Sequence, residues 1–217
     1  MGRTPGTKNQ GHDERRRELS RQVLRAVVAS GGRPSLHELA RSTGASIPTL
    51  KHYFGDRSGA VAEALRTVEV DAAAHLERLA SPGRATLPGS LRAMATELAE
   101  AWTQFGVGPL FAAGLAAGVF DERAGPGYVD GVLEPTVRAV ERRLRAHAER
   151  GELSVGADDE LGVRTAALAL LSPLLVALLH QHDLSGRQCR PLDLPAFLER
   201  HVERFLKAYG ASPPTSP

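Results

Sequence analysis

The sequence predicts an all-α fold, and three observations support that prediction. Apolar residues recur with a period of about 3.6 residues along nearly the whole chain, whereas the alternation typical of strands is almost absent. Clusters of glycine, proline and small polar residues interrupt this pattern at helix-length intervals. Of the 217 residues, 42% are hydrophobic and 24% are charged, as in an ordinary globular protein. We therefore expect nine helices between two disordered tails, residues 1–12 and 211–217.

Local signals bound the first two helices. The first runs from about Asp13 to Ser30 and stops at Gly31-Gly32, because glycine commonly follows the end of a helix. Ser35 and Glu38 have the spacing of a capping box, which predicts a short second helix as far as about Thr43.

The third and fourth helices also have caps. Ser46 caps the third, which tolerates Pro48 in its first turn. Gly55 ends that helix, and Asp56 caps a long fourth helix that continues to about residue 80.

Five further helices are expected after the break at residues 81–83. Gly125-Pro126-Gly127 forms a hinge before the seventh helix, and residues 187–191 form a loop before the ninth. The expected ranges of the fifth to ninth helices are about 87–105, 109–120, 128–150, 158–182 and 193–210.

The charge is distributed unevenly, although the net charge is only +2. Residues 1–66 contain twelve lysines and arginines against six acidic residues, and residues 67–217 have four more acidic than basic residues. A basic first part suggests a polyanion as its partner, whereas a solvated basic helix is the plain alternative.

Residues 35–54 combine the features of a helix-turn-helix. Two short helices that cross steeply need a small residue such as Ala40 and a permissive turn such as Gly44. The apolar anchors are Leu36, Leu39, Leu50 and Tyr53. The second helix would then expose the side chains that a recognition helix presents to the major groove, namely Ser46, Ile47, Thr49, Lys51 and His52. A helical hairpin without a role in DNA binding is the alternative.

This helix-turn-helix, followed by Pro48-Thr49-Leu50, Tyr53-Phe54, Asp56-Arg57 and a long helix, resembles the TetR family of transcriptional regulators. The motif covers about residues 13–66, and beyond it the resemblance rests on length and helix count. It implies a DNA-binding domain over 13–66 and a ligand-binding and dimerisation domain over 67–210. It also implies a homodimer that binds a palindromic operator, usually as a repressor that a small-molecule effector releases.

The motif and the resemblance together give nine candidate DNA-binding residues. Thr49 and Tyr53 correspond to phosphate or base contacts, and Arg57 replaces the family's usual lysine at a helix start, where a phosphate can be held. Lys51 stands where the family most often has an aromatic residue, so the base preference cannot be transferred; it could reach a phosphate or a guanine edge. The nine candidates are Ser35, Ser46, Ile47, Pro48, Thr49, Lys51, His52, Tyr53 and Arg57.

The resemblance also implies a ligand cavity enclosed by the fifth to eighth helices. A binding cavity needs apolar walls and a few polar anchors, for which His180 and Gln104 are available. Aromatic residues at helical spacing also fill cores, so the sequence leaves both interpretations open. The candidate walls are Met94, Leu98, Trp102, Phe105, Phe111, Phe120 and Tyr128.

The eighth helix, residues 158–182, is apolar nearly all round and needs cover on every side. We expect a second copy of the chain to provide it through the helices at 158–182 and 193–210. Its apolar stretch, Thr165–Leu179, is shorter than the roughly 18–20 residues of a membrane span and contains Pro173, so we expect no membrane partner.

The sequence gives no indication of catalysis, a metal site or a cofactor. The eight histidines are scattered, and no grouping of a nucleophile with a base is visible. The lone Cys189 can form neither an internal disulfide nor a cysteine-based zinc site, which fits a reducing cytoplasm. The expectation is a cytoplasmic regulator rather than an enzyme, with two alternatives: a helical protein-interaction module, or a DNA binder that responds to no effector.

Overall fold

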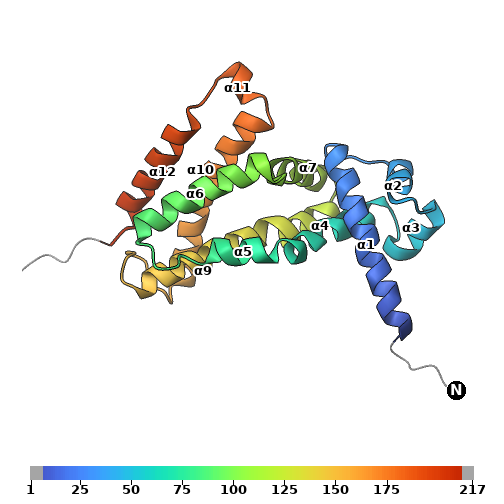
Figure 1. Ribbon diagram of the computed structural model, residues 1–217, viewed down its shortest axis with the longest axis horizontal. Helices are drawn as coiled ribbons and strands as arrows, with labels where there is room; N and C mark the ends of the chain where they lie inside the picture. Colours follow the sequence, from blue (N-terminus) through green and yellow to red (C-terminus); the bar gives the residue numbers. More distant parts are fainter. Residues whose placement is uncertain (1–6, 212–217) are drawn as a thin grey trace, which may run out of the picture. The chain divides into compact units, whose positions relative to one another are not determined.

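The computed structural model describes residues 7–211, with side chains from Gly11 onward. Over this range the chain forms twelve α-helices and one π-helix and no β-strand, so the predicted all-α class is confirmed (Figure 1). The helices belong to two compact units. The first contains the residues up to Ala72 together with Leu110–Leu133, and the second contains Ala73–Pro109 together with the residues from Glu134 onward.

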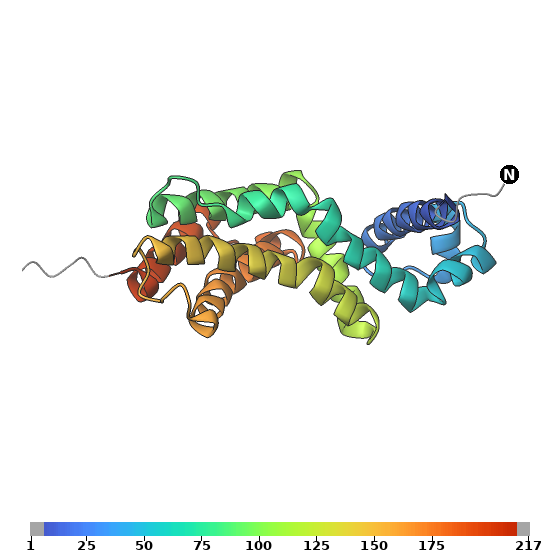
Figure 2. The same ribbon diagram turned by 90° about the horizontal axis from the view of Figure 1, so that it is seen from below.

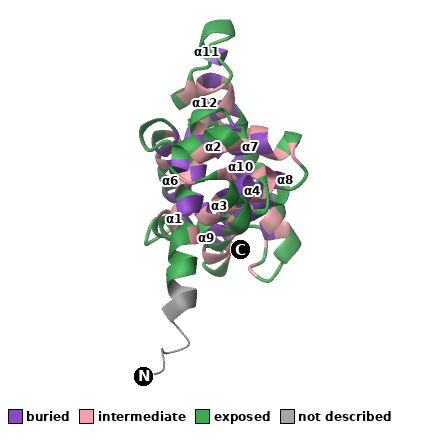
Figure 3. Ribbon diagram, turned by 90° about the vertical axis from the view of Figure 1, so that its right-hand side faces the viewer, coloured by how far each residue is buried: buried purple, intermediate pink, exposed green. Residues whose placement is uncertain are grey.

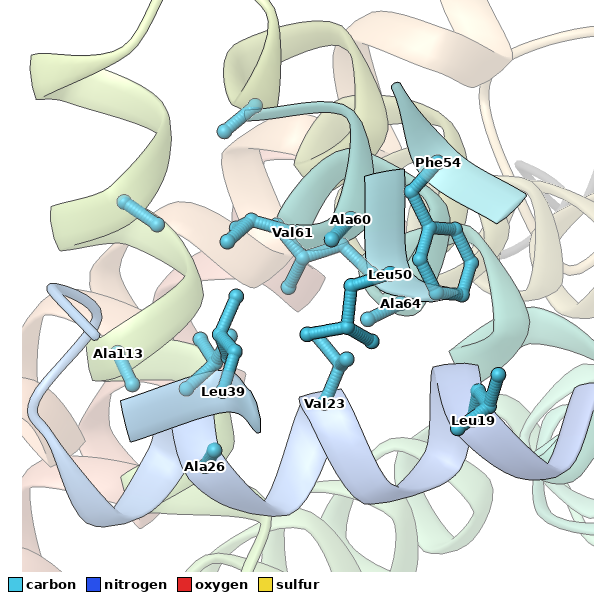
Figure 4. Close-up of a cluster of buried hydrophobic side chains, with 14 of the residues drawn as sticks. Leu19, Val23, Ala26, Leu39, Leu50, Phe54, Ala60, Val61, Ala64 and Ala113 are labelled. Carbon is cyan, nitrogen blue, oxygen red and sulfur yellow. The ribbon is translucent and has the colours of Figure 1, made fainter. Parts of the chain in front are cut away.

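The first unit contains the first three predicted helices, the first part of the fourth, and a helical segment from further along the chain. Its core is a cluster of fully buried side chains, among them Leu19 and Val23 from one helix, Leu39 from the next and Leu50 from the third (Figure 4). The elements are α1 (Thr7–Ala29), α2 (Leu36–Thr43), α3 (Ile47–Phe54), α4 (Arg57–Asp71), α7 (Val107–Phe120) from Leu110 onward, α8 (Ala124–Tyr128) and the π-helix η1 (Val129–Leu133).

The helix α1 begins at Thr7, six residues before the predicted start at Asp13. Residues 7–12, which we expected in a disordered tail, are therefore helical. The rest of that predicted tail, residues 1–6, and residues 212–217 of the second predicted tail lie outside the described residues.

The predicted caps of the helix-turn-helix are present. Glu38 N donates to Ser35 Oγ (3.2 Å) while Ser35 N donates to the Glu38 carboxylate (2.6 Å), which completes the capping box of α2. Thr49 N donates to Ser46 Oγ at the start of α3 (3.2 Å). Gly44, with a φ of 62°, adopts the left-handed conformation that ends α2, which explains why glycine stands at the turn.

The residues of the predicted hinge, 125–127, are helical instead. They belong to α8, which with η1 packs closely on α4. A Cβ atom added to Gly127 would lie 2.6 Å from Ala62 O, and one added to Gly131 would lie 2.1 Å from Leu65 O. Only glycine allows the backbones to approach so closely. The wide π-turn of η1 lies directly before Pro135, which has no N–H to continue the regular hydrogen bonding.

The second unit consists of six helices, in which α5 and α9 pack along each other (Figure 2). The predicted long fourth helix is divided at Ala72 into α4 and α5, and the predicted loop at 187–191 contains a short helix. Leu91, Leu144 and Leu170 are fully buried in the core. The helices are α5 (Ala73–Ala80), α6 (Leu87–Gln104), α9 (Glu134–Glu149), α10 (Glu160–His182), α11 (Gly186–Cys189) and α12 (Leu194–Tyr209).

The helix α10 continues through Pro173 without ending. Of the described helices, α10 is the one that by itself has the length and hydropathy of a membrane span. Half of its most apolar stretch is buried. Core helices of globular proteins have the same composition.

Side chains from distant positions hold the ends of α5 and α6. Arg143 is 5% exposed, and its guanidinium donates to the last carbonyls of α5, Leu79 O (2.7 Å) and Arg78 O (3.0 Å), and to Ser90 Oγ (2.7 Å). At the start of α6, Leu87 N donates to the carboxylate of Glu152.

Candidate nucleic-acid interface

The outer face of α3 carries most of the predicted DNA-binding side chains. Leu50 and Phe54 point into the core, which fixes the rotation of the helix and leaves Pro48, Lys51 and His52 exposed (Figure 3). Ile47, Thr49 and Tyr53 are half-buried beside them. The structure therefore exposes Pro48, Lys51 and His52 on a short, capped helix, while Tyr53 packs against the core.

The hydroxyl groups of the two capping serines have partners within the chain. Besides accepting from Thr49 N, Ser46 Oγ lies 2.8 Å from Thr49 Oγ1, and Ser35 Oγ accepts from Glu38 N. Both serines are exposed at helix N-termini, where backbone N–H groups and the helix dipole favour an anion. Both hydroxyl groups already take part in hydrogen bonds that cap the helices, so a bound phosphate would have to share these groups with the caps.

Arg57 is held by the protein itself, which the sequence did not indicate. Its Nε donates to Pro34 O (2.6 Å), and its guanidinium forms an ion pair with Asp121 (3.0 Å). Burial raises the pKa of the Asp121 carboxyl, but the hydrogen bond from Ser58, two backbone N–H groups and the charge of Arg57 outweigh it and hold the pKa below its usual value. A charged Asp121 thus competes with any phosphate for Arg57.

Further contacts join residues 110–124 to the residues on either side of the helix-turn-helix. Arg123 forms an ion pair with Asp56, the cap of α4, and the guanidinium of Arg33 lies 4.0 Å from the centre of the Phe120 ring. A Cβ on Gly32 would lie 2.3 Å from Ala113 O. The helix-turn-helix is therefore packed tightly against residues 110–124 rather than standing alone.

His12 lies beside α3, although the predicted tail included it. Its ring stacks on Tyr53, with 4.7 Å between centroids, and the ring of His52 meets Tyr53 edge-on at 5.3 Å. No apolar periodicity marks residues 7–12, so the sequence contained no signal for this contact. The first turns of α1 add His12 to the candidate interface.

The eight predicted ligand-binding residues are divided between the two units. Met94, Leu98 and Trp102 are buried in the core of the second unit, and Trp102 Nε1 donates to Asp183 (2.8 Å). Tyr128 is buried in the first unit, where its ring meets the half-buried Phe111 edge-on.

The remaining three are exposed or half-buried within their own units. Phe105 and Phe120 are 77% and 71% exposed, and His180 Nδ1 lies 2.9 Å from the side-chain amide of Gln181. Gln104 is exposed as well. The structure therefore supports core packing, the second interpretation, for the four buried members of the set, because each is enclosed by its own unit.

Comparison with known proteins identifies the fold. No protein-family model and no curated protein sequence matches the chain. A solved TetR-family transcriptional regulator from Mesorhizobium loti is 20% identical with a TM-score of 0.67, covering 92% of this chain and 98% of that one. GusR from Salmonella enterica is 16% identical with a TM-score of 0.64, covering 89% and 96%.

A third similar structure contains a small molecule. The SmeT–triclosan complex is 22% identical with a TM-score of 0.62, covering 92% of this chain and 97% of that one, and SmeT is the repressor of a Stenotrophomonas maltophilia multidrug efflux pump. At these identities the likeness establishes the fold: the chain has the fold of TetR-family transcriptional regulators.

Proposed function

We propose that the protein is a DNA-binding transcriptional regulator of the TetR type. The observation that carries this proposal is the exposed face of α3, where Lys51 and His52 stand on a capped helix that the core holds in one rotation. This helix lies in the most basic part of the chain, and recognition helices present such a face to the major groove. The similarity to solved TetR-family regulators supports the same function.

We propose further that it acts as a homodimer on a palindromic operator. Two recognition helices related by a twofold axis enter successive major grooves when they lie about 34 Å apart. A small-molecule effector that favours another spacing would lower the affinity for DNA and release repression. Such a regulator works in the cytoplasm and needs no cofactor.

An exposed apolar stripe on α10 supports the dimer. Leu161, Leu168 and Val176 are 75%, 40% and 64% exposed. Beside the stripe lies a hollow of about 580 Å³ between Pro173 and Phe197 of α12. A second copy that packs α10 and α12 against the same helices would cover both. We expect Val176→Asp to convert the dimer into a monomer in light scattering, whereas a wild-type monomer would contradict the proposed interface.

The proposal is tested by selecting an operator from a random DNA pool and measuring affinity by fluorescence anisotropy at several salt concentrations. Lys51→Ala should weaken binding and reduce the slope of log K against log [salt] by about one. The matched control is Lys207→Ala on α12, which should change neither quantity. If no DNA sequence is enriched, the proposal is wrong and a protein-interaction module becomes the better interpretation.

Arg57→Ala separates two roles of that residue. A direct phosphate contact would flatten the salt dependence as Lys51→Ala does. Because Asp121 and Pro34 O already occupy the guanidinium, we expect weaker DNA binding with an unchanged salt slope and a lower thermal midpoint.

A further inference from the structure

The first turns of α1 extend beyond the core of the first unit, beside α3 (Figure 1). Of the described side chains of α1, the first to be buried is Leu19. Two contacts hold the turns before it. Arg16 forms an ion pair with Glu63 of α4, with 3.1 Å between Nε and Oε1. One turn earlier, on the same side of the helix, the ring of His12 lies on the ring of Tyr53.

The contact between His12 and Tyr53 has the geometry of an aromatic stack. The two ring planes are inclined by 30°, and their centroids are 4.7 Å apart. The ring of His52 meets Tyr53 at 78° with a centroid distance of 5.3 Å, and it lies 6.0 Å from the ring of His12. Stacked and edge-on pairs stabilise a ring orientation beyond the effect of burial alone. Tyr53 is therefore held by two histidine rings, one of which lies on its face.

The core alone does not fix the ring of Tyr53. This side chain is half-buried and packs against the core, but it also borders a hollow of about 420 Å³ in the first unit. Phe54, Glu63 and Arg66 are among the other residues that line this hollow. Close packing is what confines a side chain to one rotamer, and an unfilled space beside the ring leaves other rotamers accessible. The stack with His12 selects one of them.

The hydroxyl group of Tyr53 is available to a ligand. It forms no hydrogen bond with any described residue, and the chain does not shield it from solvent. Tyr53 directly follows Lys51 and His52, the exposed residues that carry the proposed function. Tyrosine hydroxyls are among the side-chain groups that donate to DNA phosphates. A donor whose position is fixed before binding contributes more to affinity than a mobile one.

We propose that His12 is a positioning residue for DNA binding, because its ring holds the hydroxyl of Tyr53 where it donates to a phosphate of the duplex. This inference rests on the proposed function and adds to it a residue from α1. His12 acts through Tyr53 and through its aromatic face, so another aromatic ring at position 12 replaces it.

Nuclear magnetic resonance tests the stack on the full-length protein without DNA. The ring current of Tyr53 should shift the signals of the His12 ring protons upfield. His12→Phe identifies these signals, because one set of histidine signals disappears. Tyr53→Leu keeps an apolar side chain against the core and should move the His12 signals to the positions of an unstacked histidine. Unchanged His12 signals in Tyr53→Leu would overturn the proposal.

Fluorescence anisotropy with the duplex selected from the random pool measures the effect on affinity. His12→Ala should weaken binding about fivefold, the typical value of one stacked aromatic pair. Alanine has a higher helix propensity than histidine, so the substitution does not weaken α1 itself. The matched control is His12→Phe, which retains a ring and should bind like the wild type. Equal losses in the two variants would mean that the imidazole itself contacts DNA, and would overturn the positioning role.

A double-mutant cycle determines whether His12 acts through the hydroxyl of Tyr53. Tyr53→Phe keeps the stacked ring but removes the donor, and should weaken binding about tenfold. In the Tyr53→Phe background, His12→Ala should cause almost no further loss, because no donor is left to position. A role of His12 in holding α1 alone would weaken binding equally in both backgrounds. Additive losses would therefore overturn the proposal.

The outcomes separate this inference from the proposed function. If the wild type binds the selected duplex and His12→Ala binds it equally well, His12 has no positioning role and the regulator remains. If the pool yields no enriched sequence, the proposed function is wrong, and the positioning role is wrong with it even where the stack is seen in the spectra.

Discussion

The helices α2, α3 and α4 of the first unit and the helices α5 and α6 of the second unit have their ends capped in different ways. In the first unit α2, α3 and α4 begin with Ser35, Ser46 and Asp56, each of which accepts a hydrogen bond from the N–H three residues on. In the second unit, Thr86 at the start of α6 makes no such bond, and the carboxylate of Glu152, 65 positions later than Leu87, takes its place. The carbonyls that end α5 are likewise satisfied by Arg143.

This difference explains which parts of the fold the sequence reveals. A cap that lies within four residues of its partner can be recognised as a sequence motif. The same holds for α10 and α12 of the second unit, whose local caps are Asp159 and Asp193 and whose starts were predicted within two residues. A cap supplied from a distant residue has no sequence signature. The functions of Arg143 and Glu152 became visible only in the structure.

The units also differ in how their helices approach one another. In the first, glycines bring the backbones of α4, α8 and η1 together, whereas the second unit buries the polar side chains Arg143 and His147 between helices. The largest expected effect therefore comes from Gly131→Ala. Its new Cβ would meet the backbone at Leu65 O, which no rotamer change can relieve, so we expect a loss of about 3 kcal/mol in the free energy of unfolding.

Urea denaturation measures this loss. The control is Gly156→Ala, where a Cβ meets no atom within 4 Å and which should unfold like the wild type. An equal midpoint for the Gly131→Ala variant would mean that α4 and η1 are not in close contact.

Arg143→Met should destabilise the second unit, because it removes a buried hydrogen-bond donor. The variant keeps the aliphatic volume but leaves Leu79 O, Arg78 O and Ser90 Oγ without their buried donor, at a cost of about 2 kcal/mol. The adjacent Arg142→Met removes only the exposed ion pair with Glu77 and should cost less than about 0.5 kcal/mol. Similar losses for the two variants in urea denaturation would contradict a special role for Arg143.

The candidate site shows the same limit of sequence reasoning. Of the two anchors predicted on this helix, Leu50 is buried, whereas Tyr53 is half-buried and Phe54 is the second buried side chain. The partners of Arg57 did not follow from the sequence, since Asp121 is 64 positions away. The choice between cavity wall and core packing has the same limit: composition shows that Trp102 and Tyr128 are apolar and large, but not that each is buried in a different unit.

The stabilities of the two units should depend on pH in different ways. Burial outweighs the nearby Glu152 and lowers the pKa of His147, so the unfolded chain binds a proton that the folded chain does not. The free energy of unfolding should therefore fall as the pH drops below about 6.5, by at most about 1.4 kcal/mol per pH unit for this residue. Denaturation at pH 7.5 and 5.5 measures the effect.

His147→Gln should reduce this loss, whereas His37→Gln, at an exposed position on α2, should not. In the first unit the lowered pKa values belong to carboxyl groups, such as Glu38, lowered by the backbone N–H of Ser35, and Asp56, lowered by that of Gly59. Their contribution is present above their unfolded values and is lost only as the pH falls below about 4.5. A pH dependence that is identical in the wild type and His147→Gln would show that this histidine is not the group that titrates.

The smallest expected effect tests the capping contrast directly. Ser46→Ala removes the acceptor of Thr49 N and should cost about 1 kcal/mol, because no other group on α3 replaces it. Thr86 is the N-cap residue of α6, but its side chain makes no capping hydrogen bond. Thr86→Ala should therefore leave the free energy of unfolding almost unchanged. Glu152→Ala removes the acceptor of Leu87 N and should therefore cost more than Thr86→Ala. Equal losses for these two variants in urea denaturation would contradict a cap supplied by Glu152.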